Sequence, residues 1–143
     1  MIYFDTCALI KLVRADAATP ALSAFIDSRP RTRWFSSELA RAELIRTVRR
    51  INHDHQGRLI DDGRLAAELE YVDRLWELLD LMAVSTRVLN DAAALEQPFL
   101  RTLDAIHLAA AMSLRDSLSA FVTYDKRLVA AAQDAGLPVR SPA

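Results

Sequence analysis

The sequence has few of the residues that mark extracellular, fibrous or membrane proteins. Its 143 residues include one cysteine, three glycines and five prolines. The lone Cys7 excludes an intrachain disulfide and a cysteine-rich zinc site, and so little glycine and proline excludes collagen-like or low-complexity chains. No apolar run approaches the roughly 20 residues of a membrane span, and the first residues lack the features of a signal peptide. We therefore expect a cytoplasmic protein without a membrane segment.

An excess of one charge is missing as well. The 18 basic and 19 acidic residues give a formal net charge of −1, so the composition does not indicate a strongly basic nucleic-acid-binding protein. Hydrophobic residues make up 52% of the chain, which is enough to build a core. A length close to the roughly 150 residues of one domain favours a single domain over residues 1–143.

Strand-like and helix-like segments alternate along the chain. Short β-rich runs lie at 2–4, 33–36, 81–84, 120–123 and 137–139, with apolar residues at helical spacing between them. Thr6 is the expected N-cap of the first helix, and Ser36 or Ser37 that of the helix that runs to residue 51. Further helices are expected at 65–79, from 86 to near 98, at 103–114 and at 125–135, where Gly136 ends the helix. The alternation predicts an α/β fold: a parallel sheet of about five strands with helices on both faces.

The usual ligand-binding motifs of such sheets are absent. The three glycines are too scattered for a dinucleotide fingerprint or a phosphate-binding loop, and there is no Gly-x-Ser-x-Gly nucleophile elbow. His53 and His55 are expected at the surface of a loop, without further zinc ligands, and His107 is expected as a hydrogen-bonded core residue.

Four carboxylates fall where strands end or helices begin. Asp5 and Asp125 follow two of the expected strands, and Asp104 and Glu43 lie near the starts of two helices. In a parallel sheet these positions meet at one edge. Clustered like charges must protonate or bind a cation, and hard oxygen ligands favour Mg²⁺ or Mn²⁺ over zinc or copper. Such a metal suits phosphodiester hydrolysis.

Structural roles are the alternative for three of these acids. Asp104 and Asp125 suit helix starts because of the helix dipole, and Glu43 has the spacing for an ion pair with Arg46. Asp5 is harder to explain in this way, because it closes an apolar strand, where an unpaired charge is costly.

Four motifs, in order along the chain, resemble those of PIN-domain nucleases of the VapC toxin type. They are DTCALIKL at 5–12, AEL at 42–44, DAIHLAAA at 104–111 and TYDKRL at 123–128. The resemblance implies a PIN-like three-layer sandwich and a metal-dependent ribonuclease. It also implies that the protein is the toxin of a toxin–antitoxin pair, held inactive by a VapB-type antitoxin and usually a homodimer.

The resemblance assigns the site residue by residue. Asp5, Glu43, Asp104 and Asp125 match the acidic quartet, with Asp5 and Asp104 as the most direct ligands of Mg²⁺ or Mn²⁺. Glu38 is a rival for Glu43 but lacks its Ala-Glu-Leu context.

Smaller residues accompany the quartet. Thr6 and Thr123 match hydroxyl positions that orient carboxylates in such sites. Cys7 stands where serine or threonine is more usual, and because Thr6 is retained we expect this change to affect packing rather than chemistry.

Contacts with RNA are suggested by the face of one helix. Arg46 and Arg50 share that face with Glu43, so either is expected to hold an RNA phosphate, with a solvated basic face as the alternative. Trp76 is expected in the core or at an interface rather than as a base-stacking platform.

Other functions remain as alternatives. A PIN-type nuclease that processes ribosomal RNA or cuts single-stranded DNA would use the same residues, and a degenerate PIN domain would act only as a binding module. A phosphatase with Asp5 as nucleophile is disfavoured, because Cys7 stands where its second aspartate is expected.

Overall fold

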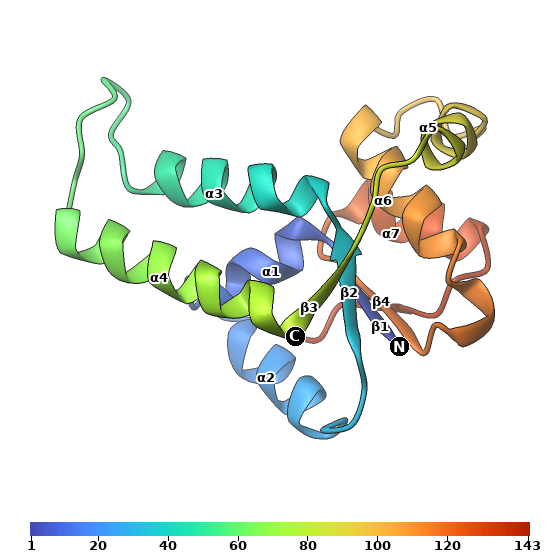
Figure 1. Ribbon diagram of the computed structural model, residues 1–143, viewed down its shortest axis with the longest axis horizontal. Coiled ribbons are helices and arrows are strands. Elements are labelled where there is room, and N and C mark those ends of the chain that lie inside the picture. The colour runs from blue at the N-terminus through green and yellow to red at the C-terminus, as the bar shows by residue number, and fades with distance from the viewer.

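The first strand of the chain lies at the centre of a five-stranded parallel sheet with the order β3-β2-β1-β4-β5. The computed structural model describes all 143 residues, and Figure 1 shows helices on both sides of this sheet. The predicted α/β class with a parallel five-stranded sheet is confirmed.

Strands and helices alternate through most of the chain. The elements are β1 (Ile2–Phe4), α1 (Thr6–Val13), α2 (Thr19–Asp27), β2 (Trp34–Ser37), α3 (Leu39–Ile51), α4 (Asp62–Leu78), β3 (Leu79–Met82), α5 (Thr86–Ala93), α6 (Thr102–Met112), the short 3-10 helix η1 (Arg115–Ser117), β4 (Ala120–Val122), α7 (Lys126–Asp134) and β5 (Val139–Arg140). None of these helices has the length and apolar content required to cross a bilayer.

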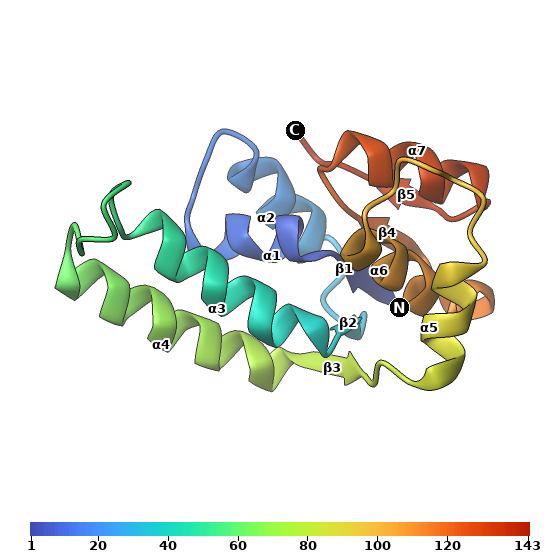
Figure 2. The ribbon, with the colours of Figure 1, turned by 90° about the horizontal axis from the view of Figure 1, so that it is seen from above.

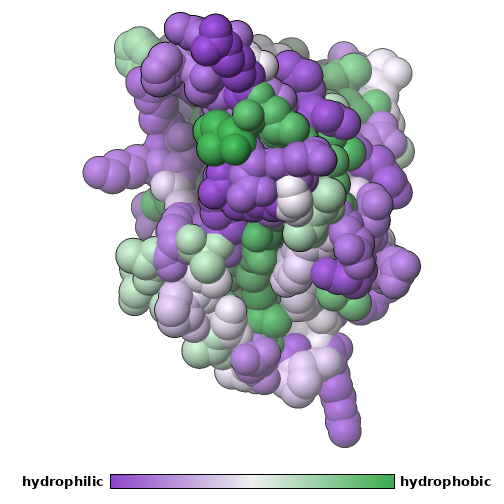
Figure 3. Space-filling model, turned by 90° about the vertical axis from the view of Figure 1, so that its left-hand side faces the viewer, coloured by the Kyte–Doolittle hydropathy of each residue, from purple (hydrophilic) through white to green (hydrophobic).

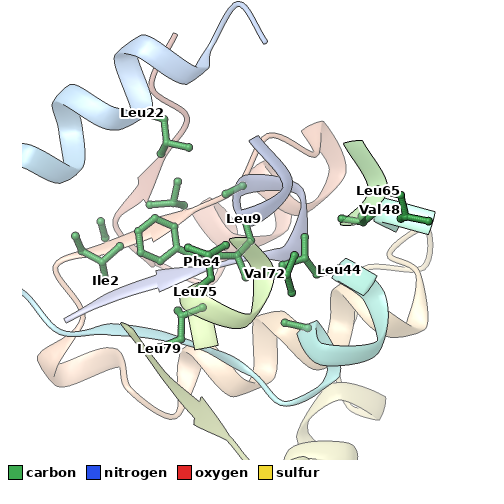
Figure 4. Close-up of a cluster of buried hydrophobic side chains, with 14 residues drawn as sticks. Ile2, Phe4, Leu9, Leu22, Leu44, Val48, Leu65, Val72, Leu75 and Leu79 are labelled. Carbon is green, nitrogen blue, oxygen red and sulfur yellow. The ribbon is translucent and has the colours of Figure 1, made fainter. Parts of the chain in front are cut away.

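The two faces of the sheet carry two separate apolar clusters. Successive side chains of a strand point to opposite faces, so Ile2 and Phe4 pack with α1, α2, α3 and α4, whereas Tyr3 packs with α5, α6 and α7. Figure 2 shows the two groups of helices on either side of the strands, and Figure 4 shows the Ile2–Phe4 cluster. All three β1 side chains are fully buried, which explains why this strand reads as an apolar run.

One strand and one helix differ clearly from the sequence-based prediction. The third strand begins at Leu79 rather than at residue 81, because α4 passes into it without a loop. In this stretch the alternation of Leu79 and Leu81 overlaps the helical spacing of the preceding residues. The strand lies at an edge of the sheet and is partly exposed, not buried. The helix from Thr86 is also shorter than predicted and ends at Ala93.

The predicted N-caps of two helices are wrong. Asp5 holds the N-cap position of α1, with an extended backbone, and the Thr6 hydroxyl is used elsewhere. Ser36 and Ser37 belong to β2, and the Ser36 hydroxyl donates a hydrogen bond to the Phe4 carbonyl of the neighbouring strand. The last helix ends as predicted at Gly136, whose φ of 74° only glycine adopts readily.

Candidate active site

All four predicted carboxylates line one cavity of about 480 Å³ beside the carboxyl end of the central strand. They come from four separate segments: the end of β1, helix α3, the first turn of α6 and the start of α7. The residues around the cavity are Asp5, Thr6, Cys7, Ile10, Glu43, Thr47, Arg50, Arg101, Thr102, Leu103, Asp104 and Asp125. The parallel sheet therefore brings together the acids that the sequence places at strand ends and helix starts.

Asp5 is nearly buried and is held by two neutral donors. Its Oδ2 accepts hydrogen bonds from the Cys7 thiol at 2.7 Å and from the Thr123 hydroxyl at 2.9 Å. Burial and the charge of Asp5 raise the pKa of Cys7 to about 12, so the thiol stays protonated and can donate. Cys7 was expected to affect packing more than chemistry; the structure adds that its sulfur bonds directly to a carboxylate of the cluster.

Glu43 is held by residues from two other helices. Its Oε2 accepts hydrogen bonds from the Thr6 hydroxyl of α1 and from His107 Nε2 of α6, both at 2.7 Å. Burial raises the pKa of Glu43, but the hydrogen bonds from His107 and Thr6 and the charge of His107 outweigh it and lower that pKa overall. The alternative of an ion pair with Arg46 is wrong, since Glu43 bonds across the fold and not along its helix.

His107 is the hydrogen-bonded core residue that was expected, with only 1% of its surface exposed. Its Nδ1 lies 2.9 Å from the Tyr3 hydroxyl, and its Nε2 lies 3.8 Å from Asp5 Oδ1 in addition to the contact with Glu43. Burial lowers the pKa of His107, but the hydrogen bond of Glu43 and the charges of Asp5, Glu43 and Asp104 raise it overall.

The sequence reasoning missed that His107 joins the carboxylate cluster. A signal was present, because His107 follows Asp104 by three residues and therefore lies on the same face of the helix. Arg101, at the N-cap position of α6, lines the cavity and was not singled out by the sequence reasoning either.

Asp104 and Asp125 are placed differently from the other two acids. The Asp104 side chain, half-buried in the first turn of α6, has no hydrogen-bond or ion-pair partner. Burial and the charges of Asp5, Asp125 and Glu43 raise its pKa. Asp125 caps α7, with Oδ1 accepting from the backbone amides of Arg127 and Leu128. Asp125 thus fills the structural role considered for it and also lines the cavity.

The donor chemistry of the cavity fits a hard divalent cation, since it offers carboxylate oxygens and only a protonated thiol. No three histidine, cysteine, aspartate or glutamate side chains converge closely enough to enclose a metal ion on their own. Mg²⁺ is usually bound by one or two carboxylates and keeps several of its waters, so its binding does not require three converging side chains.

The remaining candidate residues lie in different places. Arg50 lines the carboxylate cavity, whereas Arg46 lies in a neighbouring groove. Glu38 is outside the cavity, and its Oε1 accepts a hydrogen bond from the Val84 amide. Trp76 packs partly buried against the α1–α4 cluster, as expected for a core position.

Comparisons with known proteins agree with this fold. A PIN domain model matches residues 2–134. Ribonuclease VapC35 of Mycobacterium tuberculosis (strain CDC 1551 / Oshkosh) is 36% identical, covering 99% of this chain and 97% of the relative. Ribonuclease VapC46 of Mycobacterium tuberculosis (strain ATCC 25618 / H37Rv) is 39% identical, with the same coverage. Among solved structures, VapBC2 from Rickettsia felis bound to a DNA fragment from its promoter has a TM-score of 0.72 at 12% identity, over 100% of both chains. The chain belongs to the PIN-domain family and, within it, to the VapC ribonucleases.

Proposed function

We propose that the protein is a metal-dependent endoribonuclease and the toxin of a VapBC-type toxin–antitoxin pair. The observation that carries this proposal is the cavity in which Asp5, Glu43, Asp104 and Asp125 meet. The proposal is also supported by a relative that is named a VapC ribonuclease and is 36% identical over 99% of this chain. Clustered acids have no use in a pure binding module, since their mutual repulsion only destabilises the fold.

Within this proposal, Asp5 and Asp104 are the most direct ligands of a Mg²⁺ or Mn²⁺ ion, and Glu43 and Asp125 complete the site directly or through water. A bound ion of this kind polarises a phosphoryl oxygen and lowers the pKa of an attacking water. Thr123 holds Asp5 with its hydroxyl.

Thr6 and His107 both hold Oε2 of the Glu43 carboxylate. We regard His107 as a positioning residue, because it acts through Glu43 and does not line the cavity itself. The Arg50 side chain, which does line the cavity, is positioned to hold a phosphate of the RNA near the carboxylates.

The remaining assignments rest on the family. The proposed partner is a VapB-type antitoxin, in line with the VapBC2 complex among the similar structures, and the proposed assembly is a homodimer. Residues 1–143 form one PIN domain in this proposal, because β1 contributes to both apolar clusters. The site of action is the cytoplasm, where an RNA-cleaving toxin meets its substrate.

A calorimetric Mn²⁺ titration of the antitoxin-free protein tests the metal site before any RNA target is known. The Asp104→Asn variant should lose saturable binding that the parent shows. Asp73→Asn is the matched control, because Asp73 is exposed on α4 and lies outside the cavity. Binding in the parent should also raise the thermal stability, by about 2.7 kcal/mol at a hundredfold excess over Kd.

Absence of binding at millimolar metal, or equal binding by Asp104→Asn, would overturn the metal assignment. The toxin assignment is tested separately by induced expression. Growth arrest that Asp5→Ala abolishes supports the proposal, whereas growth of cells that express the intact chain without its antitoxin contradicts it.

A further inference from the structure

A second polar cavity, which we call the α3 groove, lies along the carboxyl-terminal part of α3. It has a volume of about 450 Å³ and is lined by Arg46, Arg49, Arg50, His53 and Asp54, with no hydrophobic residue among them. Arg50 lines both this groove and the carboxylate cavity, so the two cavities adjoin. Seen from the end that carries the α3–α4 loop, the surface has hydrophilic side chains around a central band of hydrophobic ones (Figure 3).

The positive charge in the α3 groove is not neutralised by neighbouring acids. Arg14, Arg33, Arg74 and Arg87 each form an ion pair, whereas none of the groove arginines does. The one acid in the groove, Asp54, turns its Oδ1 to the backbone amides of Gln56 and Arg58 within its own loop. The groove therefore presents three unpaired guanidinium groups to an incoming anion.

The groove continues the line of the carboxylate site along the helix. Glu43, Arg46 and Arg50 recur at intervals of three and four residues within α3, so they share one face of the helix. His53 lies two residues beyond the end of α3. A rise of about 1.5 Å per residue places Arg50 roughly 10 Å beyond Glu43 along the axis. A nucleic-acid strand covers this length with about three nucleotides, since it rises about 3.4 Å per nucleotide when stacked.

We propose that the α3 groove binds the sugar–phosphate backbone of single-stranded RNA a few nucleotides away from the bond that is cut. Arginine forks suit phosphate oxygens, and three of the five groove residues are arginines, with no phenylalanine, tyrosine or tryptophan ring on which bases could stack. The groove therefore supplies affinity for the backbone and not for a base sequence. This inference rests on the proposed function for the identity of the ligand, but binding in the groove requires neither metal nor cleavage.

The test measures binding of fluorescently labelled oligouridylates, about 4 and about 12 nucleotides long, by fluorescence anisotropy over a series of salt concentrations. All proteins carry Asp104→Asn, so that the RNA stays intact. Arg46→Ala and Arg49→Ala alter the groove without touching the carboxylate cavity. Arg31→Ala is the matched control, because Arg31 is exposed, has no ion pair and lies in the turn before β2. Alanine favours helix, so the α3 variants should fold.

Each groove variant should weaken binding of the longer oligouridylate and reduce the slope of log K against log salt by about 0.7, the value for one phosphate contact on a single strand. Arg31→Ala should change neither quantity. Unchanged affinity and slope in both groove variants would overturn the inference. Displacement of the oligouridylate by polyglutamate of equal charge at a lower concentration would also overturn it, because the groove would then fit an acidic polypeptide better than RNA.

These outcomes are separable from those of the proposed function. A protein that binds Mn²⁺ and arrests growth, but whose groove variants bind oligouridylate like their parent, refutes only the groove. A protein that fails the Mn²⁺ titration, while its groove variants lose one phosphate contact each, refutes the metal-dependent nuclease and leaves the groove as an RNA-binding surface.

Discussion

The buried hydrogen bond between His107 and Glu43 can be tested with two substitutions, because each one replaces a different nitrogen of the imidazole ring. In His107→Gln, the side-chain amide nitrogen lies close to the position of Nε2 and can still donate to Glu43. In His107→Asn, the shorter amide lies near Nδ1, which faces Tyr3, and Glu43 loses its donor. Both variants are uncharged, so the comparison isolates the hydrogen bond from the charge.

The expected effect on stability follows from these contacts. A hydrogen bond to a charged group contributes about 1.5–3 kcal/mol, and the shorter side chain of His107→Asn also leaves part of a fully enclosed ring space empty, which adds to the loss. We expect His107→Asn to lower the free energy of unfolding by about 2–4 kcal/mol and His107→Gln by about 1 kcal/mol.

Urea unfolding measures these changes, and the Mn²⁺ titration measures whether Glu43 is still positioned. His107→Gln should keep most of the Mn²⁺ affinity, whereas His107→Asn should lose it along with RNA cleavage. Tyr3→Phe is the control, because it removes the hydroxyl at Nδ1 and leaves the donor to Glu43. Equal losses of metal affinity in the Gln and Asn variants would refute the positioning argument.

The same pair predicts how stability depends on pH. The pKa of His107 is raised from 6.5, so its contribution is fully present below pH 6.5 and is lost as the pH rises through the raised value. The pKa of Glu43 is lowered from 4.5, so its contribution is present above pH 4.5 and is lost as the pH falls through the lowered value. The difference in free energy of unfolding between the parent and His107→Gln should therefore be largest between pH 4.5 and pH 6.5. A difference that grows toward alkaline pH would contradict this assignment.

Three further predictions concern other parts of the site and fold. Without metal at neutral pH, Asp104→Asn should raise the melting temperature, because burial and like charges penalise the ionised acid. Asp5→Asn should lower the melting temperature, because Asp5 accepts two hydrogen bonds. Shifts of the same sign in both variants would refute this contrast. Cys7 should resist iodoacetamide in the native protein and react after unfolding, as judged by mass spectrometry, since its pKa is about 12; rapid native labelling would contradict the hydrogen bond to Asp5. Gly136→Ala should lower the free energy of unfolding, measured with urea, by about 1–2 kcal/mol, because residue 136 has a positive φ. Gly63→Ala, within α4 and without a close contact, should not lower it.

The sequence was sufficient to predict the architecture and the meeting place of the acids. The alternation of strands and helices fixes a parallel sheet, and a parallel sheet places strand ends and helix starts at one edge. The cavity lined by Asp5, Glu43, Asp104 and Asp125 follows from that rule. Local boundaries were less predictable where two periodicities overlap, as at the junction of α4 and β3 near Leu79.

The partners of the acids were less predictable, because they depend on contacts between distant segments. Thr123 and Asp5 are 118 residues apart, and His107 and Glu43 are 64 residues apart. Helical spacing places His107 on the face of Asp104, but only the tertiary fold, which brings α3 and the start of α6 to the same cavity, shows that its ring reaches Glu43. The role of a single buried histidine in an alanine-rich helix therefore follows from its tertiary contacts and not from the sequence of its own segment.

The distribution of donors explains how one fold tolerates four neighbouring acids. Asp5 and Glu43 each receive two side-chain hydrogen bonds, and Asp125 receives two from the start of α7. Asp104 receives none and carries the raised pKa that its neighbours impose. The repulsion of the cluster is thus concentrated on one side chain at the start of α6. A divalent cation that neutralises Asp104 relieves most of that repulsion, so cation binding and the stability of the α6 start are coupled through this residue.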